Sequence, residues 1–102
     1  MRFKVIYLYI LECADTTYYT GVTNNLERRL VEHNSGINKT SYTFNKRPVK
    51  LVFYTTFTDF NSAFQFETKI KKWSHAKKKA LIKNHFELLK LLSKKNFIKQ
   101  NF

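Results

Sequence analysis

The stretch Tyr19-Thr20-Gly21-Val22-Thr23-Asn24-Asn25-Leu26-Glu27-Arg28-Arg29-Leu30-Val31-Glu32-His33-Asn34 decides the predicted fold of this chain. Its first residues favour a strand, and Asn24 is a suitable N-cap, with Glu27 three residues later to complete a capping box. The helix predicted from this cap runs to about Asn34. It ends at Gly36, because glycine readily adopts the left-handed conformation of a helix C-terminus.

The residues before this stretch predict a β-hairpin. Residues 3–12 carry apolar side chains on both faces, which is typical of a central strand. A turn over residues 13–16 returns the chain along a second strand, residues 17–22. This hairpin brings Tyr9 and Tyr19 within a residue or two of cross-strand register.

The residues after the helix alternate between a polar loop and regular elements. The sequence predicts a loop over residues 37–48, a strand over 49–57, and helical segments over 59–73, 74–84 and 86–92. Asp59 or Asn61 caps the first of these segments. Its apolar face comprises Ala63, Phe66, Ile70 and Trp73.

The order ββαβααα predicts the α+β class, with a three-stranded, mainly antiparallel sheet flanked by helices. At 102 residues the chain is long enough for a single core. We expect one domain over residues 1–93 and a basic, frayed tail over residues 94–102.

The charge of the chain is strongly positive and uneven. The net charge is +12, of which residues 1–60 contribute +3 and residues 61–102 contribute +9. Such a field favours a polyanionic partner, most simply nucleic acid. The alternative is a set of lysine-rich helix faces that are only solvated. We predict that backbone phosphates contact Lys69, Lys71, Lys72, Lys77, Lys78, Lys79 and Arg47; lysine supplies charge without base-reading geometry.

The remaining composition excludes several classes of protein. The one cysteine excludes an internal disulfide and favours a reducing compartment. One cysteine and three scattered histidines form no structural zinc pattern. No apolar run approaches the roughly 20 residues of a membrane span. We therefore expect a cytoplasmic protein with no membrane contact.

The helix after Gly21 holds two arginines that are not equivalent. At about 100° per residue, Arg29 and His33 share one sector with Leu26, whereas Arg28 and Glu32 point elsewhere. A cation held beside apolar neighbours indicates a phosphate clamp. The alternative is an arginine whose stem packs on Leu26 while its guanidinium reaches solvent.

Glu67 is the candidate carboxylate. It lies at the flank of the apolar face of its predicted helix, and a hard cation such as Mg²⁺ often takes one or two carboxylates with phosphate and water. The alternative is an ion pair with Lys71 one turn later, which stabilises a helix by only ~0.2–0.5 kcal/mol. The tyrosines also have an alternative role, in which the ring packs in the core and the hydroxyl lies at its rim.

Together these residues resemble the GIY-YIG nuclease domain. The resemblance rests on Tyr7-Leu8-Tyr9, on Tyr19-Thr20-Gly21 ten residues later, and on Asn25, Arg29, His33 and Glu67. It extends from residue 3 to about 83 and is closest to small stand-alone bacterial GIY-YIG proteins. The tripeptides alone are weak motifs, but their joint spacing with the charged residues is specific.

The resemblance implies a role for each matching position. Tyr9 and Tyr19 match the motif tyrosines that position or deprotonate water, and His33 occupies a further proton-handling or phosphate-contacting position. Arg29 matches the phosphate-stabilising arginine, and Glu67 matches the ligand of a divalent metal, Mg²⁺ or Mn²⁺. The implied activity is endonucleolytic cleavage of DNA, with branched or damaged DNA as candidate substrates.

Three positions depart from the family pattern, and two alternative functions stay open. Tyr7 stands where the first motif begins with glycine, Thr20 replaces the middle isoleucine of the second motif, and Val22 stands where excision-repair relatives carry a lysine. One alternative is a non-catalytic nucleic-acid-binding module that keeps the fold. The other is a partner-dependent subunit that docks another protein through exposed aromatic residues, for which the candidates are Phe44, Phe57 and Phe97.

Overall fold

The computed structural model of the chain describes residues 4–94, and side chains for residues 4–85. Three strands form its antiparallel sheet in the order β2-β1-β3: β1 is Ile6–Glu12, β2 is Tyr18–Thr23 and β3 is Lys50–Phe57. The predicted α+β class and the central place of the first strand are confirmed. Tyr19 pairs with Leu11 and Gly21 with Tyr9, so the two tyrosines are two residues apart in register, as predicted.

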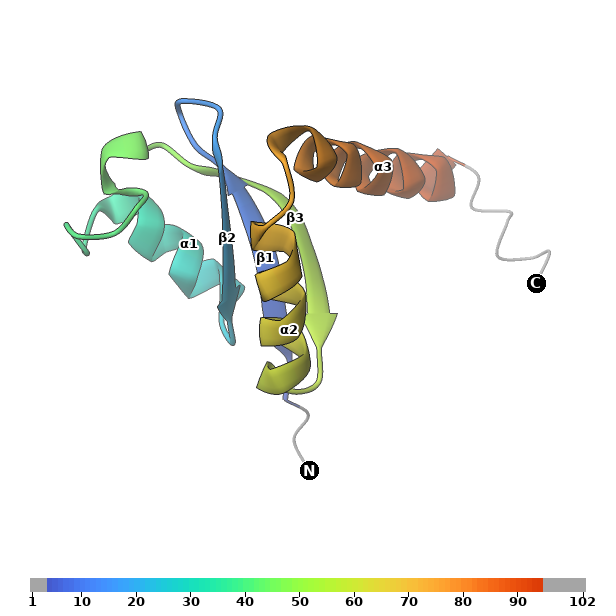
Figure 1. The fold of residues 1–102 in the computed structure, drawn as a ribbon, viewed down its shortest axis with the longest axis horizontal. Helices are drawn as coiled ribbons and strands as arrows, with labels where there is room; N and C mark the ends of the chain where they lie inside the picture. Colours follow the sequence, from blue (N-terminus) through green and yellow to red (C-terminus); the bar gives the residue numbers. More distant parts are fainter. Residues whose placement is uncertain (1–3, 95–102) are drawn as a thin grey trace.

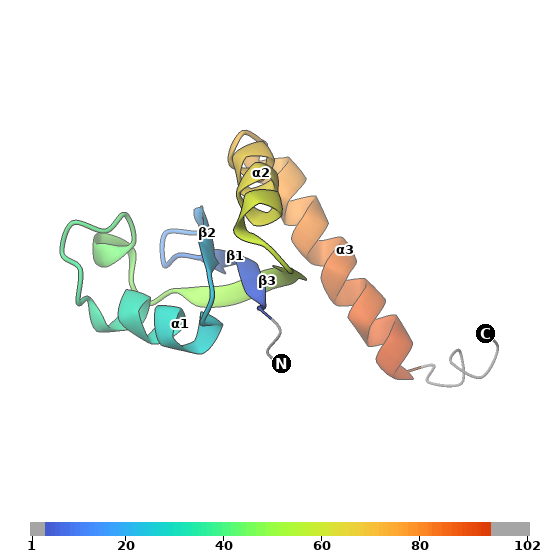
Figure 2. The same ribbon diagram turned by 90° about the horizontal axis from the view of Figure 1, so that it is seen from below.

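Helices cover both faces of the sheet (Figures 1 and 2). Helix α1 (Leu26–Ser35) lies on one face, while α2 (Phe60–Lys71) and α3 (His75–Lys94) lie on the other. The strand β1 contributes to a core on each side because its side chains alternate in direction. Leu8 and Ile10 pack with Phe53 and Ile70 under α2 and α3. Facing α1 is the second core cluster, which contains Tyr9, Leu11, Cys13 and Val49.

Helix α1 begins one residue later than predicted. Its N-cap is Asn25, whose side-chain Oδ1 accepts a hydrogen bond from the Arg28 amide at 3.0 Å. The Thr23 hydroxyl accepts from the Asn25 amide at 3.1 Å and holds Asn25 in an extended conformation. The capping box of Asn24 and Glu27 is therefore wrong. The predicted end at Gly36 is confirmed, with φ at 71°.

The C-terminal helices differ from the prediction at one point. Asp59 caps α2 by accepting from the Ser62 amide at 2.8 Å, which decides between the two predicted caps. The two helices expected over 74–84 and 86–92 are one continuous helix, α3. No glycine or proline lies within His75–Lys94 to end it. The predicted tail lies outside the described residues from position 95 onward.

The loop between α1 and β3 is anchored at several points. The Asn34 side chain donates to the Val49 carbonyl at 3.1 Å and accepts from the Val49 amide at 2.8 Å. Phe44–Lys46 forms a short 3₁₀ turn, and Lys46 forms an ion pair with Asp15 in the β1–β2 turn. These contacts hold the loop beside the ends of β1 and β2. Within the described residues, no helix has the length and apolarity to cross a membrane.

Candidate active site

The hydroxyl of Tyr9 lies over Gly21 on the neighbouring strand. Tyr9 is 1% exposed, and a Cβ added to Gly21 would lie 2.5 Å from the Tyr9 hydroxyl oxygen. Real Cβ contacts essentially never fall below 3.0 Å, so glycine is required here for space. The motif glycine therefore makes room for the motif tyrosine.

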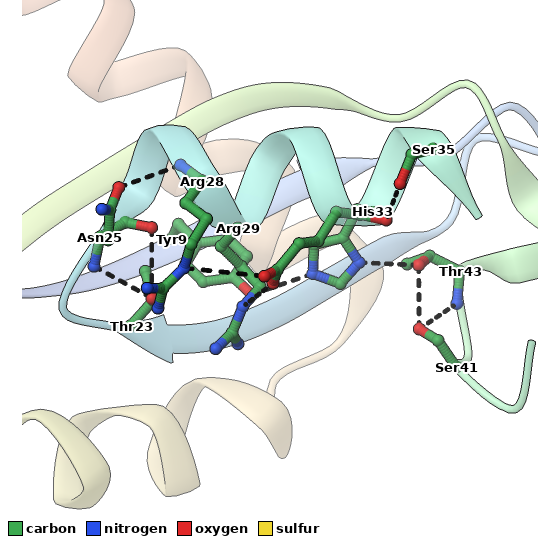
Figure 3. A network of polar contacts seen from close by, with 10 residues as sticks. Tyr9, Thr23, Asn25, Arg28, Arg29, His33, Ser35, Ser41 and Thr43 are labelled. Carbon is green, nitrogen blue, oxygen red and sulfur yellow. Dashed lines mark hydrogen bonds and ion pairs between the residues drawn. The ribbon is translucent and has the colours of Figure 1, made fainter. Parts of the chain in front are cut away.

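His33 connects Tyr9 to the loop after α1. Its Nε2 lies 3.1 Å from the Tyr9 hydroxyl, and its Nδ1 lies 2.8 Å from the Thr43 hydroxyl. Thr43 is 1% exposed and its hydroxyl lies 3.1 Å from that of Ser41. Figure 3 shows this chain of polar groups below α1, with Arg29 beside Tyr9. Tyr19 packs edge-on against the His33 ring at 5.1 Å between centroids.

The surroundings favour the neutral forms of both central groups. Burial, followed by the nearby Tyr19, raises the pKa of Tyr9 to about 12, and the hydrogen bond and charge of Arg29 offset part of that rise. Burial, followed by the charge of Arg29, lowers the pKa of the His33 imidazole. At neutral pH the site therefore holds a phenol and an uncharged imidazole, which is able to accept a proton.

Arg29 faces the site as predicted, but Glu32 does so as well. Arg29 Nε donates to Glu32 Oε1 at 3.1 Å, and Arg28 lies 3.6 Å from the same carboxylate. The prediction that Glu32 points elsewhere is therefore wrong, since long side chains reach beyond the sector of their Cα atoms. Arg29, Glu32 and His33 line a pocket of about 330 Å³ together with Tyr19, Asn38, Ser41, Thr43 and Phe44.

Glu67 approaches the site from α2, on the other face of the sheet. Its side chain is 16% exposed, and its negative charge is among the groups that raise the pKa of Tyr9. It also forms the alternative predicted from the sequence, an ion pair with Lys71 at 3.3 Å. The carboxylate therefore makes a minor contribution to the raised pKa of Tyr9, and its direct partner is Lys71.

The Glu67 carboxylate is an oxygen ligand of the kind that a hard divalent ion prefers. No group of three or more metal-binding side chains occurs among the residues that the structure describes. A single carboxylate nevertheless suits Mg²⁺ or Mn²⁺, because such ions keep several waters and take further oxygen ligands from a substrate phosphate. The Lys71 ammonium, 3.3 Å from this carboxylate, competes with such an ion for it.

The predicted nucleic-acid-binding residues fall into two groups. Six lysines lie along the end of α2 and the start of α3: Lys69, Lys71, Lys72, Lys77, Lys78 and Lys79. Arg47 is separate from them. It stacks on Phe44 at 4.5 Å and lies against Gly36 at the end of α1.

Of the aromatic residues suggested for docking a protein, two are described. Phe44 is half-buried beneath Arg47, and Phe57 is half-buried against Phe66, with ring centroids 5.8 Å apart. Their predicted exposure is therefore wrong; Phe97 lies outside the described residues. Phe60 and Phe64 are exposed instead, and their rings stack on α2 at 5.6 Å.

Comparisons with known proteins identify the family of this chain. Residues 5–80 match the family model described as the GIY-YIG catalytic domain. The chain therefore belongs to the GIY-YIG family, a nuclease superfamily. A UPF0213 protein of Syntrophus aciditrophicus is 49% identical over 79% of this chain and 93% of its own length. A UPF0213 protein of Desulfotalea psychrophila is 44% identical over 76% of this chain and 70% of its own.

Solved structures give the same result for the fold. Protein EF2693 of E. faecalis has a TM-score of 0.58 and 36% identity, covering 83% of this chain and 88% of its own. UPF0213 protein BH0048 of Bacillus halodurans has a TM-score of 0.51 and 37% identity, covering 78% and 83%. Within the GIY-YIG family, this chain is one of the small UPF0213 proteins.

Proposed function

We propose that this protein is a metal-dependent endonuclease that hydrolyses phosphodiester bonds in DNA. The observation that carries the proposal is the position of the Tyr9 hydroxyl, 3.1 Å from Nε2 of a neutral His33. The charges of Arg29 and Glu67 both affect the pKa of this hydroxyl. Hydrolysis of a phosphodiester requires a proton acceptor, a cation for the phosphate and a place for a metal ion. The GIY-YIG catalytic domain supports the same reaction class.

Tyr9 and His33 handle the proton of the attacking water. The neutral ring accepts the phenol proton at Nε2, and the Tyr9 oxygen takes the proton of the water, so the imidazole gains the charge. Thr43 accepts from Nδ1–H and keeps the ring in this tautomer and orientation. The water oxygen then bonds to phosphorus while the bond to the leaving oxygen breaks. Tyr19 packs on His33 and holds the ring in place.

Arg29 would stabilise charge on the reacting phosphate directly, and Glu67 would do so through the ion that it holds. Arg29 neutralises the negative charge that develops on the phosphate oxygens. Glu67 supplies the carboxylate ligand for Mg²⁺ or Mn²⁺. When bound, the ion polarises the phosphate and stabilises the leaving oxygen. The lysines of α2 and α3 contact the DNA backbone without reading sequence, which suits branched or damaged DNA as substrate.

The ion pair between Glu67 and Lys71 favours a second function. If the Lys71 ammonium permanently occupies the carboxylate, the domain binds nucleic acid and does not cut it. Such a module keeps salt-sensitive binding through its lysines. It shows no metal-dependent turnover.

The two functions are distinguished by cleavage of a panel of branched, nicked, single-stranded and duplex DNA, with matching RNA substrates. We expect cleavage with Mg²⁺ or Mn²⁺, none with EDTA, and a loss of at least about 100-fold in Arg29→Ala. Arg28→Ala is the matched control, since it removes an adjacent arginine that also contacts Glu32. Equal activity of the two variants would refute the role of Arg29. A wild-type protein that binds but never cleaves is the second function.

A further inference from the structure

A groove crosses the edge strand β2 beside the candidate active site. It has a volume of about 350 Å³, and its walls are Tyr18, Tyr19, Thr20, Tyr42, Lys71 and Lys78. These residues come from β2, the loop after α1, the end of α2 and the start of α3. The volume lies at the lower end of the ~300–1,000 Å³ of ligand sites.

The groove adjoins both halves of the candidate active site. Tyr19 is a common wall, because it also lines the pocket that contains Arg29 and His33. Lys71 lines the groove and forms the 3.3 Å ion pair with Glu67. The groove therefore shares one wall with the pocket of Arg29 and His33 and one residue with the ion pair of Glu67.

One hydroxyl in the wall of the groove has no partner. Thr20 is 4% exposed. Among the side chains of residues 4–85, its Oγ1 is the one buried oxygen or nitrogen atom that makes no hydrogen bond. Thr23, three residues later on the same strand, is equally buried, yet its hydroxyl contacts the Asn25 backbone at 3.1 Å and 3.3 Å. A buried unpaired hydroxyl destabilises a protein, so its presence indicates a partner from outside the chain.

The charges of the groove identify the class of that partner. Two ammonium groups and a hydroxyl donor suit an anion with several acceptor oxygens, and lysine suits phosphate without base recognition. We propose that the groove binds the backbone phosphate next to the scissile phosphodiester, with the Lys78 ammonium as a direct donor. The Thr20 hydroxyl, which is closed off from solvent in the free protein, is a second donor that the phosphate reaches when the side chains over it move aside. This inference rests on the proposed function, since it takes the same substrate, but it concerns binding and not chemistry.

The test measures binding of a short labelled DNA duplex in EDTA, where no cleavage occurs, together with thermal unfolding of the free protein. Thr20→Val removes the hydroxyl and keeps the shape. We expect an unchanged or higher Tm, because an unpaired buried group is lost, and about tenfold weaker DNA binding. Thr20→Ser keeps the hydroxyl and binds like the wild type. A Thr20→Val protein that binds DNA like the wild type, or unfolds at a lower temperature, overturns the proposal.

Lys78 has a control of the same charge outside the groove. Lys50 on β3 lines a different depression, with Ile82. We expect Lys78→Gln to weaken binding and to reduce the slope of log K against log salt by about 0.9, and Lys50→Gln to do much less. Equal effects of the two variants would mean that the positive charge attracts DNA without a defined binding site, and would refute phosphate binding in the groove. Both measurements omit metal, so they report DNA binding in the groove separately from cleavage. Failure of groove binding can therefore be distinguished from failure of the proposed nuclease activity.

Discussion

Replacement of Gly21 by alanine tests whether the motif glycine serves the motif tyrosine. The added Cβ would lie 2.5 Å from the hydroxyl oxygen and 2.6 Å from Cζ of Tyr9. Ordinary contact begins at about 3.4 Å, so the Tyr9 ring must shift by about 1 Å. The ring is 1% exposed, which leaves it no free direction. The shift therefore disturbs the 3.1 Å contact with His33.

The expected magnitudes follow from that displacement. Overpacking a core costs about 1–3 kcal/mol, and a one-ångström misplacement of a reacting group lowers activity about 100-fold. Backbone strain adds nothing, since Gly21 is not among the residues with positive φ. We expect the free energy of unfolding, measured with urea, to fall by about 1–3 kcal/mol, and metal-dependent cleavage to fall about 100-fold.

A second substitution separates this explanation from a general intolerance at Gly21. Tyr9→Leu shortens the side chain and leaves space that the new methyl group fills. We expect Gly21→Ala to cost much less stability in the Tyr9→Leu background than in the wild type. A cost that is equal in both backgrounds, or a Gly21→Ala protein with wild-type stability and activity, would refute the clash.

Three further predictions concern the supports of the site. Because the pKa of His33 is lowered on folding, the unfolded state binds more protons; stability therefore falls as the pH drops from about 6.5 through the lowered pKa. Urea midpoints should show this fall in the wild type and less of it in His33→Gln. Thr43→Val leaves the His33 ring without its partner in the loop and should cost about 1–3 kcal/mol and slow cleavage, while Thr43→Ser should retain both; equal behaviour of the two variants argues against the hydrogen bond. Asn34→Ala removes two hydrogen bonds to the Val49 backbone and should lower stability by about 1–3 kcal/mol; an unchanged urea midpoint contradicts this anchoring role.

The sequence was sufficient to predict the sheet, because hydrophobic periodicity determines which strand is buried on both faces. It placed the end of α1 for a similar local reason, the conformational freedom of Gly36. The start of the helix was misplaced because either Asn24 or Asn25 is a good cap. The choice depends on the Thr23 hydroxyl, a contact that residue preferences do not contain.

The sequence predicted that Arg29 and His33 lie together, as they do in the structure, but it did not predict the side chains that support them. Spacing and helix rotation grouped Arg29 with His33, and family resemblance added Tyr9 and Glu67. Thr43 was missed because its role depends on the path of the loop over residues 37–48, which sequence periodicity does not encode. The only indication of Thr43 in the sequence was that it is a small polar residue within a polar loop. Glu32 was missed because helix rotation places Cα atoms and not the ends of long side chains.

The central claim is that Tyr9 and Glu67 act in one site, although they come from opposite faces of the sheet. A double-mutant cycle of Tyr9→Phe and Glu67→Gln, measured by the rate of metal-dependent DNA cleavage, tests it most directly. Residues that act as a unit are strongly non-additive, so we predict that the double variant is about as slow as the slower single variant. Rates that multiply as independent effects would contradict the claim, and so would wild-type cleavage by Glu67→Gln.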